Sequence, residues 1–243
     1  MRAGEREFRH RFWIFGAIFW IAFFLYRVDP VNVSEWLLRR LAPALDPDMP
    51  PGRHALQALF GLGALLCFAG AWIRTWATSY LRSVVVHDGA VQTAGLVADG
   101  PYRHVRNPLY LGTQLVMIGM AFAASRLGAL FLVGGGLIFH LRLVGREEAA
   151  LAAAQGEAFR AYCARVPRFL PALAPRVPSA GRTPRWGQGL AGEAFMGLFG
   201  VAMATFAITL DARSLMYGSG IAVVLYFVVV SLLRRREAAR AGR

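Results

Sequence analysis

The sequence predicts an all-α integral membrane protein with about six transmembrane helices. Of its 243 residues, 56% are hydrophobic and 17% are charged, whereas a soluble domain carries about a quarter charged residues. Several apolar runs approach or exceed the roughly 20 residues that a helix needs to cross a bilayer. Arginines gather beside these runs, as they do at the ends of membrane-spanning helices. Together these observations exclude an ordinary soluble domain.

The first predicted span follows a cluster of N-terminal arginines and resembles the start of a signal peptide. No small-residue cleavage site follows it, so we interpret it as a retained span. Only Ser125 and Arg126 separate the third span from the fourth, which predicts a tight hairpin. The six spans cover residues 12–27, 55–76, 109–124, 127–145, 190–210 and 214–233.

Glycines are frequent in the predicted hairpin, at Gly112, Gly119, Gly128 and residues 134–136. Small residues allow membrane helices to approach closely, so these glycines could form a helix–helix contact. Glycine is also simply more frequent in membrane helices than in soluble ones. The sequence leaves both interpretations open.

Residues 77–108 do not form a span. Turn signals at residues 87–89 and 99–101 flank a stretch that is compatible with β-structure. Residues 34–41, with Trp36 at headgroup level, have the pattern of a short interfacial helix.

A cytoplasmic helix is expected over residues 147–164. It should end at Val166, because a proline at position 167 disfavours helix at the residue before it. A linker with prolines at positions 171, 175, 178 and 184 then leads to the last two spans.

The distribution of arginine predicts the orientation in the membrane. With six spans, the N-terminus and residues 77–108, 146–189 and 234–236 all lie on one side. Because these segments are rich in arginine, we expect that side, with both termini, to be cytoplasmic. The loop over residues 28–54 lies opposite, and its three arginines (Arg39, Arg40 and Arg53) run against the rule. A chain of prokaryotic origin would lie in the cell inner membrane.

The formal net charge of +13 does not indicate a nucleic-acid partner. The chain contains no lysine, and its arginines lie where the membrane topology already explains them. The two cysteines, Cys67 and Cys163, fall at different predicted depths, so we expect no disulfide, and no metal-ligand spacing occurs.

Two polar motifs stand at the two ends of the predicted hairpin. The first is Gly-Pro-Tyr-Arg-His-Val-Arg-Asn-Pro-Leu-Tyr-Leu-Gly over residues 100–112. The second begins at Glu147 and Glu148 and ends at Pro171. It also includes Leu151, Phe159, Tyr162 and the run Val166-Pro167-Arg168-Phe169-Leu170. Both motifs reach the same membrane surface, so a polar binding site there is expected.

In these two motifs the chain resembles the isoprenylcysteine carboxyl methyltransferase family, which is related to phospholipid N-methyltransferases. The resemblance covers about residues 55–171 and implies an integral membrane enzyme that uses S-adenosyl-L-methionine, with its cofactor pocket on the cytoplasmic side. The implied acceptor is lipidic or apolar, enters from the bilayer, and is a carboxylate such as prenylcysteine. The phospholipid relationship leaves an amine acceptor as the alternative. Residues 1–54 then hold the first span and interfacial loop, and residues 172–243 add a linker and two spans.

The resemblance also implies which residues form the site. Roles in methyl transfer would fall to Arg106, Asn107 and Arg168. Cofactor contacts would fall to Tyr102, His104, Arg106, Asn107, Pro108, Tyr110, Leu111, Glu147, Glu148 and Tyr162. The family usually has histidine where this chain has Asn107, and an amide can hydrogen-bond but cannot carry charge.

Adjacent residues on a helix point about 100° apart, so Glu147 and Glu148 cannot both face one spot. Glu148 lies nearer the stripe that ends at Phe159 and Tyr162, so we expect it to bind the cofactor and Glu147 to pair with an arginine. The alternative is a solvated acidic pair at a helix start, where the helix dipole favours it. The arginines could likewise be surface anchors, and Tyr102 and Tyr110 interfacial aromatics.

A transporter or another non-catalytic membrane protein is the alternative from a different class. Transporters place polar residues at mid-membrane, whereas those of this chain gather at one rim. We expect the last two spans, residues 190–233, to leave the cofactor untouched, because their ionisable residues lie near span ends. They would wall the acceptor's entry path or form a homodimer contact.

Overall fold

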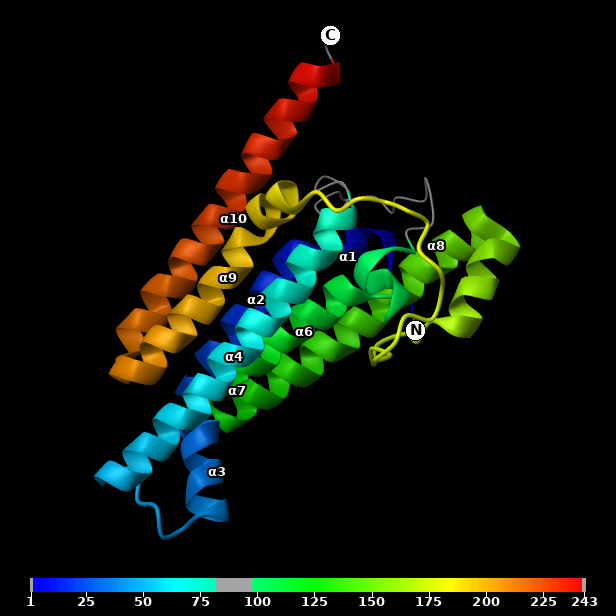
Figure 1. The fold of residues 1–243 in the computed structure, drawn as a ribbon. Coiled ribbons are helices and arrows are strands. Elements are labelled where there is room, and N and C mark those ends of the chain that lie inside the picture. Colours follow the sequence, from blue (N-terminus) through cyan, green and yellow to red (C-terminus); the bar gives the residue numbers. More distant parts are fainter. Residues whose placement is uncertain (1, 82–97, 242–243) are drawn as a thin grey trace.

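The described residues, 2–81 and 98–241, form an elongated bundle of helices in the computed structural model (Figure 1). No strand occurs among them, which confirms the all-α prediction. The turn signal at residues 87–89 and the β-compatible stretch lie outside the described residues. Side chains beyond Leu232 are not described.

Every apolar segment predicted as a span is helical. Among the described residues, four helical stretches are long and apolar enough to cross a membrane: Pro50–Tyr80, Arg126–Arg165, Trp186–Thr209 and Ala212–Leu232. The helices α2 and α6 have 14 residues each, so the count of six spans stays a prediction. In order, the elements are α1 (Glu5–Arg9), α2 (Arg11–Phe24), η1 (Leu25–Arg27), α3 (Val33–Leu41), α4 (Pro50–Tyr80), η2 (Gly100–Arg103), α6 (Pro108–Ala121), α7 (Arg126–Leu130), η3 (Phe131–Gly135), α8 (Gly136–Arg165), α9 (Trp186–Thr209) and α10 (Ala212–Ala241).

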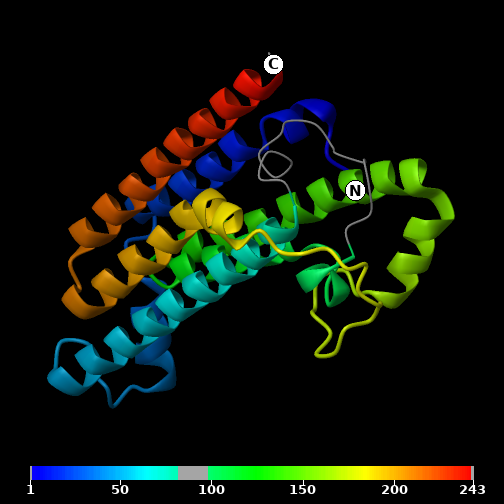
Figure 2. The ribbon, with the colours of Figure 1, turned by 45° about the horizontal axis from the view of Figure 1, so that its top comes forward.

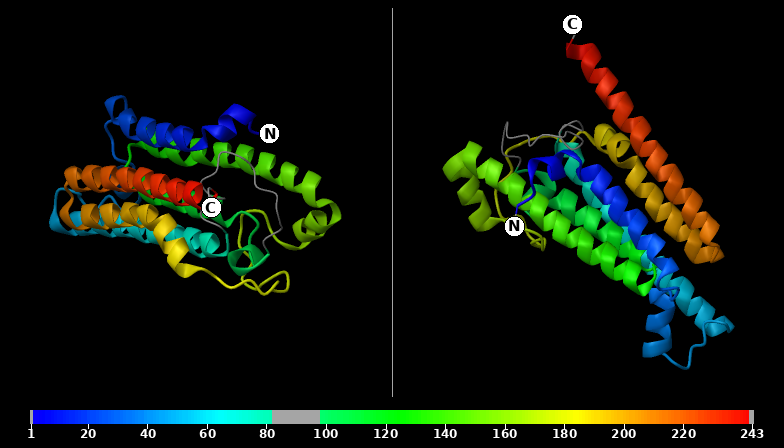
Figure 3. Two further views of the ribbon diagram at one scale, coloured as in Figure 1. Left: turned by 90° about the horizontal axis from the view of Figure 1, so that it is seen from above. Right: turned by 180° about the vertical axis from the view of Figure 1, so that it is seen from behind.

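The long helix α4 packs against both α6 and α9, and α10 packs along α9 (Figure 3). The N-terminus, η2, the linker after α8 and the C-terminal end of α10 all lie toward one end of the bundle (Figure 1). The helix α3 lies at the other end. This arrangement agrees with one polar end of the bundle. That this end faces the cytoplasm stays a prediction.

Glycines allow α4 and α6 to touch backbone to backbone. A Cβ atom on Gly112 would lie 2.6 Å from the carbonyl oxygen of Gly70, and Gly119 faces Gly63 in the same way. The two glycines of α6 therefore form a helix contact, but with α4 rather than with the other half of the hairpin. Within the hairpin, the close approach is that of Gly136 to Met117.

The turn between α6 and α7 is short, but it covers residues 122–125 rather than the predicted Ser125 and Arg126, because α6 ends at Ala121 and Arg126 already belongs to α7. Ser125 caps α7 by accepting a hydrogen bond from the Gly128 amide at 3.0 Å. Asp29 pairs with Arg126 at 2.9 Å, and this hydrogen bond lowers the pKa of the Asp29 carboxyl. These contacts anchor the turn to the segment after α2.

The helix α8 ends as predicted but does not run straight. Val166 has extended backbone (φ −96°, ψ 126°) directly before Pro167. At Gly156, however, the backbone leaves the helical region (φ 54°, ψ −124°), a conformation that glycine adopts without steric cost. The expectation of one continuous helix over residues 147–164 was therefore wrong. The second half turns back toward the bundle, as Figure 2 shows.

Candidate functional site

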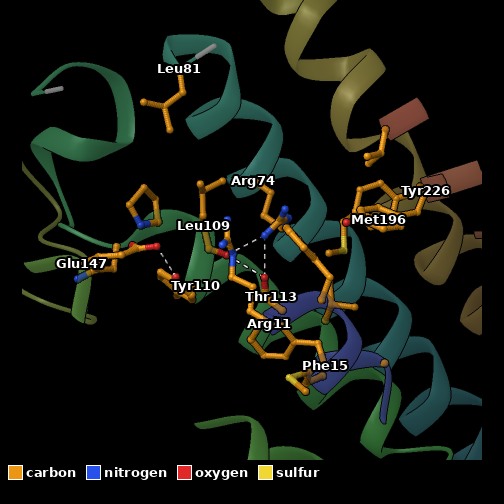
Figure 4. A pocket seen from close by; sticks show the side chains of 18 of the residues that line it. Arg11, Phe15, Arg74, Leu81, Leu109, Tyr110, Thr113, Glu147, Met196 and Tyr226 are labelled. Atoms are coloured by element: carbon orange, nitrogen blue, oxygen red, sulfur yellow. Dashed lines mark hydrogen bonds between the residues drawn. The ribbon is translucent and has the colours of Figure 1, made fainter. Parts of the chain in front are cut away.

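A cavity of about 840 Å³ opens inside the bundle, lined by residues of α2, α4, α6, α8, α9 and α10. This volume is in the range of small-molecule sites. One end is polar and the other is lined by aromatic and aliphatic side chains, in part visible in Figure 4. The polar lining includes Arg11, Arg74, Arg106, Asn107, Tyr110, Thr113, Glu147 and Glu148. The apolar lining includes Phe15, Phe19, Met117, Phe195, Phe199 and Phe227.

The two sequence motifs meet at the polar end. The Arg106 amide donates to the carbonyl of Pro167 at 2.9 Å, and the Asn107 side-chain amide donates to the carbonyl of Arg168 at 3.2 Å. Asn107 precedes α6, and Pro108 occupies the first turn of that helix, where proline is well tolerated. The bend at Gly156 is what returns the second motif to the first.

Glu148 is the centre of this junction. Its carboxylate lies 2.9 Å from Nη2 of Arg168 and 3.4 Å from Nη1 of Arg106, and it accepts a hydrogen bond from Asn107 at 3.1 Å. The side chains of Glu148 and Arg106 are each 17% exposed. The Nε atoms of Arg106 and Arg168 are buried and have no hydrogen-bond partner among the described residues. Two guanidinium groups thus keep donor capacity beside a carboxylate that they already hold.

Glu147 points to a different partner. It accepts a hydrogen bond from the Tyr110 hydroxyl at 2.7 Å, and Figure 4 shows the two side chains meeting in the cavity. The two adjacent glutamates thus face different groups, as the helical spacing predicted. The close arginine contacts belong to Glu148, whereas we had expected them at Glu147.

Tyr102 and Tyr162 also line the cavity, on the side where α8 folds back. The Tyr162 hydroxyl donates to the backbone carbonyl of Tyr102 at 2.7 Å. Burial raises the pKa of the Tyr102 phenol well above its ordinary value, so this phenol stays neutral. Both tyrosines therefore offer neutral aromatic surface to the cavity.

Three of the predicted site residues do not line the cavity: His104, Leu111 and Arg168. Nδ1 of His104 lies 2.8 Å from the carbonyl oxygen of Ala172, which ties the first motif to the linker. Arg168 reaches the site through Glu148. The other predicted residues, from Tyr102 to Tyr162, lie together at the polar end.

A buried ion pair on the cavity wall was missed by the sequence analysis. Arg74 of α4 binds Glu193 of α9 through two contacts, Nε to Oε2 at 2.7 Å and Nη2 to Oε1 at 3.0 Å. Thr78 donates to the same carboxylate at 2.9 Å, and Arg74 Nη1 donates to Thr113 at 2.8 Å. Glu193 lies two turns inside α9, which starts at Trp186. The available signal was a single ionisable residue in each of two apolar runs.

Comparison with known proteins bears on this site. Residues 59–157 match the phospholipid methyltransferase (PEMT) family model. The matched segment contains both glutamates of the second motif and the whole first motif, and it excludes Arg11, Arg168 and Glu193. No curated protein and no solved structure matches the chain. The family match supports a membrane methyltransferase.

The polar end has the chemistry that a cofactor with a carboxylate, an ammonium and an adenine ring requires. The unused Nε donor of Arg106, which lines the cavity, suits a carboxylate, because guanidinium binds carboxylate with directed hydrogen bonds. Glu147 and Glu148 suit an ammonium or ribose hydroxyls, and Tyr102 and Tyr162 offer surface for a planar ring. The residues present therefore fit S-adenosylmethionine.

Proposed function

We propose that this protein is an integral membrane methyltransferase that uses S-adenosyl-L-methionine to methylate a carboxylate on a lipidic acceptor, such as a prenylcysteine. The family match supports the methyltransferase class. The cofactor would supply the methyl group from its sulfonium. The acceptor chemistry and the residue roles rest on the arrangement of the cavity.

The observation that carries the proposal is the junction at Glu148. Arg106 and Asn107 from the first motif and Arg168 from the second converge on this one carboxylate. The junction closes the polar end of a cavity whose other end is apolar. Such a cavity orients a polar cofactor and a lipid tail toward each other and excludes water, and these effects dominate catalysis of a direct displacement.

The state of the acidic residues favours a carboxylate acceptor. A carboxylate is already ionised at neutral pH, so its methylation needs no general base. An amine acceptor needs one, and the two glutamates at the polar end are engaged. Glu148 is held by two arginines, and Glu147 accepts a hydrogen bond from Tyr110. His104 does not line the cavity, and its ring contacts the carbonyl of Ala172.

A second candidate is N-methylation of a phospholipid amine, which the description of the matched family favours. Glu147 would then be the nearest group to take the proton, because its oxygen lies on the cavity wall. The two reactions differ in their products. A methyl ester releases methanol in base, whereas an N-methyl group does not.

Calorimetric titration of the purified protein with S-adenosylhomocysteine tests the class of the protein before any acceptor is known. We expect saturable binding with one site per chain. Labelled methyl transfer to prenylcysteine, followed by base treatment, then tests the acceptor. A folded protein that does not bind S-adenosylhomocysteine would contradict the proposal. If only phosphatidylethanolamine were labelled and the label resisted base, the reaction would be N-methylation of the phospholipid amine rather than methylation of a carboxylate.

A further inference from the structure

The linker after α8 carries the two most exposed large apolar side chains among the described residues. Leu170 is 83% exposed, and Leu173, at 102%, is as exposed as in an extended chain. Both belong to a run of seven uncharged residues, Phe-Leu-Pro-Ala-Leu-Ala-Pro over 169–175, which we call the apolar loop. A single exposed leucine is ordinary on a protein surface, whereas two on one short loop mark a contact surface.

Backbone contacts fix the apolar loop on the first motif. Ala172, between the two leucines, donates its amide to the carbonyl of His104 at 3.0 Å, and its carbonyl oxygen lies 2.8 Å from Nδ1 of the His104 ring. Directly after the loop, the amide of Arg176 donates to the carbonyl of Arg103 at 2.8 Å, and Nε of Arg103 donates to the carbonyl of Val177 at 2.9 Å. Contacts on both strands of the loop therefore hold the leucines outward, and their exposure is a property of the fold.

The apolar loop lies beside the bundle rather than beyond its end. In Figure 1 the start of the linker turns back along the outside of the helices before it crosses the polar end to α9. Figure 3 also shows this loop at the edge of the bundle when the molecule is seen from above. The long helices have the length and composition to cross a membrane, so a loop that turns back beside them meets the headgroup region of the bilayer.

The charges around the apolar loop suit the surface of a membrane. Arg165 precedes the loop, Arg176 follows it, and both are exposed. Within the described part of the chain neither arginine forms an ion pair. Three other arginines of this segment have acidic neighbours: Arg160 beside Glu157, Arg168 beside Glu148 and Arg182 beside Asp99. Two exposed cations on either side of apolar side chains match the anionic headgroups and acyl chains of a lipid surface.

A protein partner fits the apolar loop less well than a bilayer does. A stable protein interface buries about 800 Å² on each partner, far more than two leucine side chains offer. A bilayer requires no such area, because each apolar side chain that enters it gains free energy on its own. The size of the loop therefore favours lipid.

We propose that the apolar loop inserts Leu170 and Leu173 into the bilayer at the polar end, and that Arg165 and Arg176 bind anionic lipid headgroups beside it. The loop is hydrogen-bonded to the first motif, so its insertion holds the polar end of the cavity at the level of the headgroups. This inference does not depend on the proposed methyltransferase function.

Spin labelling of the full chain in lipid vesicles tests the insertion. A nitroxide is attached at Leu170→Cys or at Leu173→Cys, each of which leaves the other leucine in place. Ala180→Cys is the matched control, because Ala180 is an exposed residue of the same linker. Cys163→Ser in every protein removes the partly exposed native thiol, whereas Cys67 is buried. Collisions of each label are measured with oxygen, which concentrates in the bilayer, and with a nickel chelate, which stays in water.

We expect the labels at positions 170 and 173 to collide mainly with oxygen and the label at position 180 mainly with the nickel chelate. Adding Leu170→Ser to the protein labelled at position 173 should lower the ratio of inserted to withdrawn loop by about tenfold, the scale of one leucine returned to water. Thermal unfolding in detergent checks that this variant is intact, as its exposed position predicts.

The arginines are tested with vesicles of phosphatidylcholine alone or mixed with phosphatidylglycerol. Arg165→Gln together with Arg176→Gln should lower the inserted fraction in the anionic vesicles by about fivefold for each arginine. The same pair of changes should have no effect in the neutral vesicles. Equal insertion with and without the arginines in the anionic vesicles would exclude the headgroup contact.

Two outcomes of the labelling would overturn the insertion itself. If the labels at positions 170 and 173 collided with the nickel chelate as often as the label at position 180, the loop would lie in water. If they were shielded from both probes, the loop would be covered by protein, such as a second copy of the chain. A failure to bind S-adenosylhomocysteine, which contradicts the proposed function, leaves both readouts unchanged.

Discussion

Two arginine–glutamate clusters border the same cavity. They differ in how many of their hydrogen-bond donors and acceptors have a partner. In the Arg74–Glu193 pair, the side chains are 7% and 0% exposed, and their hydrogen bonds use both carboxylate oxygens and all three guanidinium nitrogens. In the Glu148 cluster, exposure rises to 17% for Glu148 and 39% for Arg168. There the Nε atoms of Arg106 and Arg168 are buried without a partner among the described residues.

This difference separates a structural role from a binding role. A buried polar network whose hydrogen bonds are all made fixes one arrangement of its helices, here α4 against α9. A cluster with unused buried donors is costly in isolation, and a native protein usually has a reason to keep it. At the polar end of a cavity, that reason is a ligand. We therefore interpret the pair as a structural element of the fold, and we propose that the Glu148 cluster binds the cofactor.

Breaking the buried pair should have the largest effect. Glu193→Leu leaves the Arg74 charge unpaired between α4 and α9, which should cost about 3–5 kcal/mol of folding free energy. Replacing both residues, as Arg74→Met with Glu193→Leu, removes the uncompensated charge and should restore most of the stability. Thermal unfolding in detergent measures both variants.

The exposed pair of Arg9 and Glu5 serves as the matched control, since both side chains are more than half exposed. Glu5→Gln should barely move the unfolding temperature, because exposed ion pairs contribute little. If the double variant at the buried pair were as unstable as Glu193→Leu alone, the pair would have a role beyond mutual neutralisation.

Disturbing the Glu148 cluster should affect binding more than stability. Glu148→Gln removes a charge-assisted partner from Arg106 and Arg168, so S-adenosylhomocysteine should bind more weakly by about 1–3 kcal/mol. Glu147→Gln should cost less, because Tyr110 can still donate to the amide oxygen. Calorimetric titration measures both affinities, and unfolding in detergent shows whether each variant is intact. Wild-type affinity in a folded Glu148→Gln would exclude this glutamate from the cofactor site.

Much of this arrangement could be predicted from local sequence patterns. Apolar length indicated the helices, two residues between two apolar runs indicated the hairpin, and Pro167 indicated where α8 ends. These features depend on the backbone or on nearest neighbours. The contact between the two motifs could also be predicted, because they stand at the two ends of a hairpin and a hairpin returns both ends to one side.

The rest depends on tertiary packing that spacing does not encode. Arg74 and Glu193 are 119 positions apart, and only the contact between α4 and α9 brings them together. Gly156 could have continued the helix, because glycine tolerates helical backbone as well as the positive φ seen here. The division at residue 172 stays a prediction. The helix α9 supplies Glu193 to the buried pair and Phe195 to the cavity wall, and α10 adds Phe227 to that wall.

The smallest effect is expected where the linker is fastened to the first motif. Asp99 accepts hydrogen bonds from the Ser179 hydroxyl at 2.5 Å and from the amides of Ala180 and Arg182 at 2.9 and 3.2 Å. Desolvation raises the pKa of the Asp99 carboxyl, but these hydrogen bonds outweigh it and hold the pKa below its ordinary value of 3.8. The charged form is therefore the one that fastens the linker.

The sign of the pH dependence follows from that lowered pKa. The stabilisation by Asp99 is complete above pH 3.8 and is lost as the pH falls through the lower folded-state value. Asp99→Asn should cost about 0.5–1.5 kcal/mol at neutral pH, the scale of one hydrogen bond, and should flatten the acid limb of the stability curve. Thermal unfolding between neutral and acid pH measures this limb. An equally steep limb in wild type and variant would place the acid-sensitive group elsewhere. Since the Glu148 cluster is not touched, S-adenosylhomocysteine should bind the variant at neutral pH as it binds the wild type.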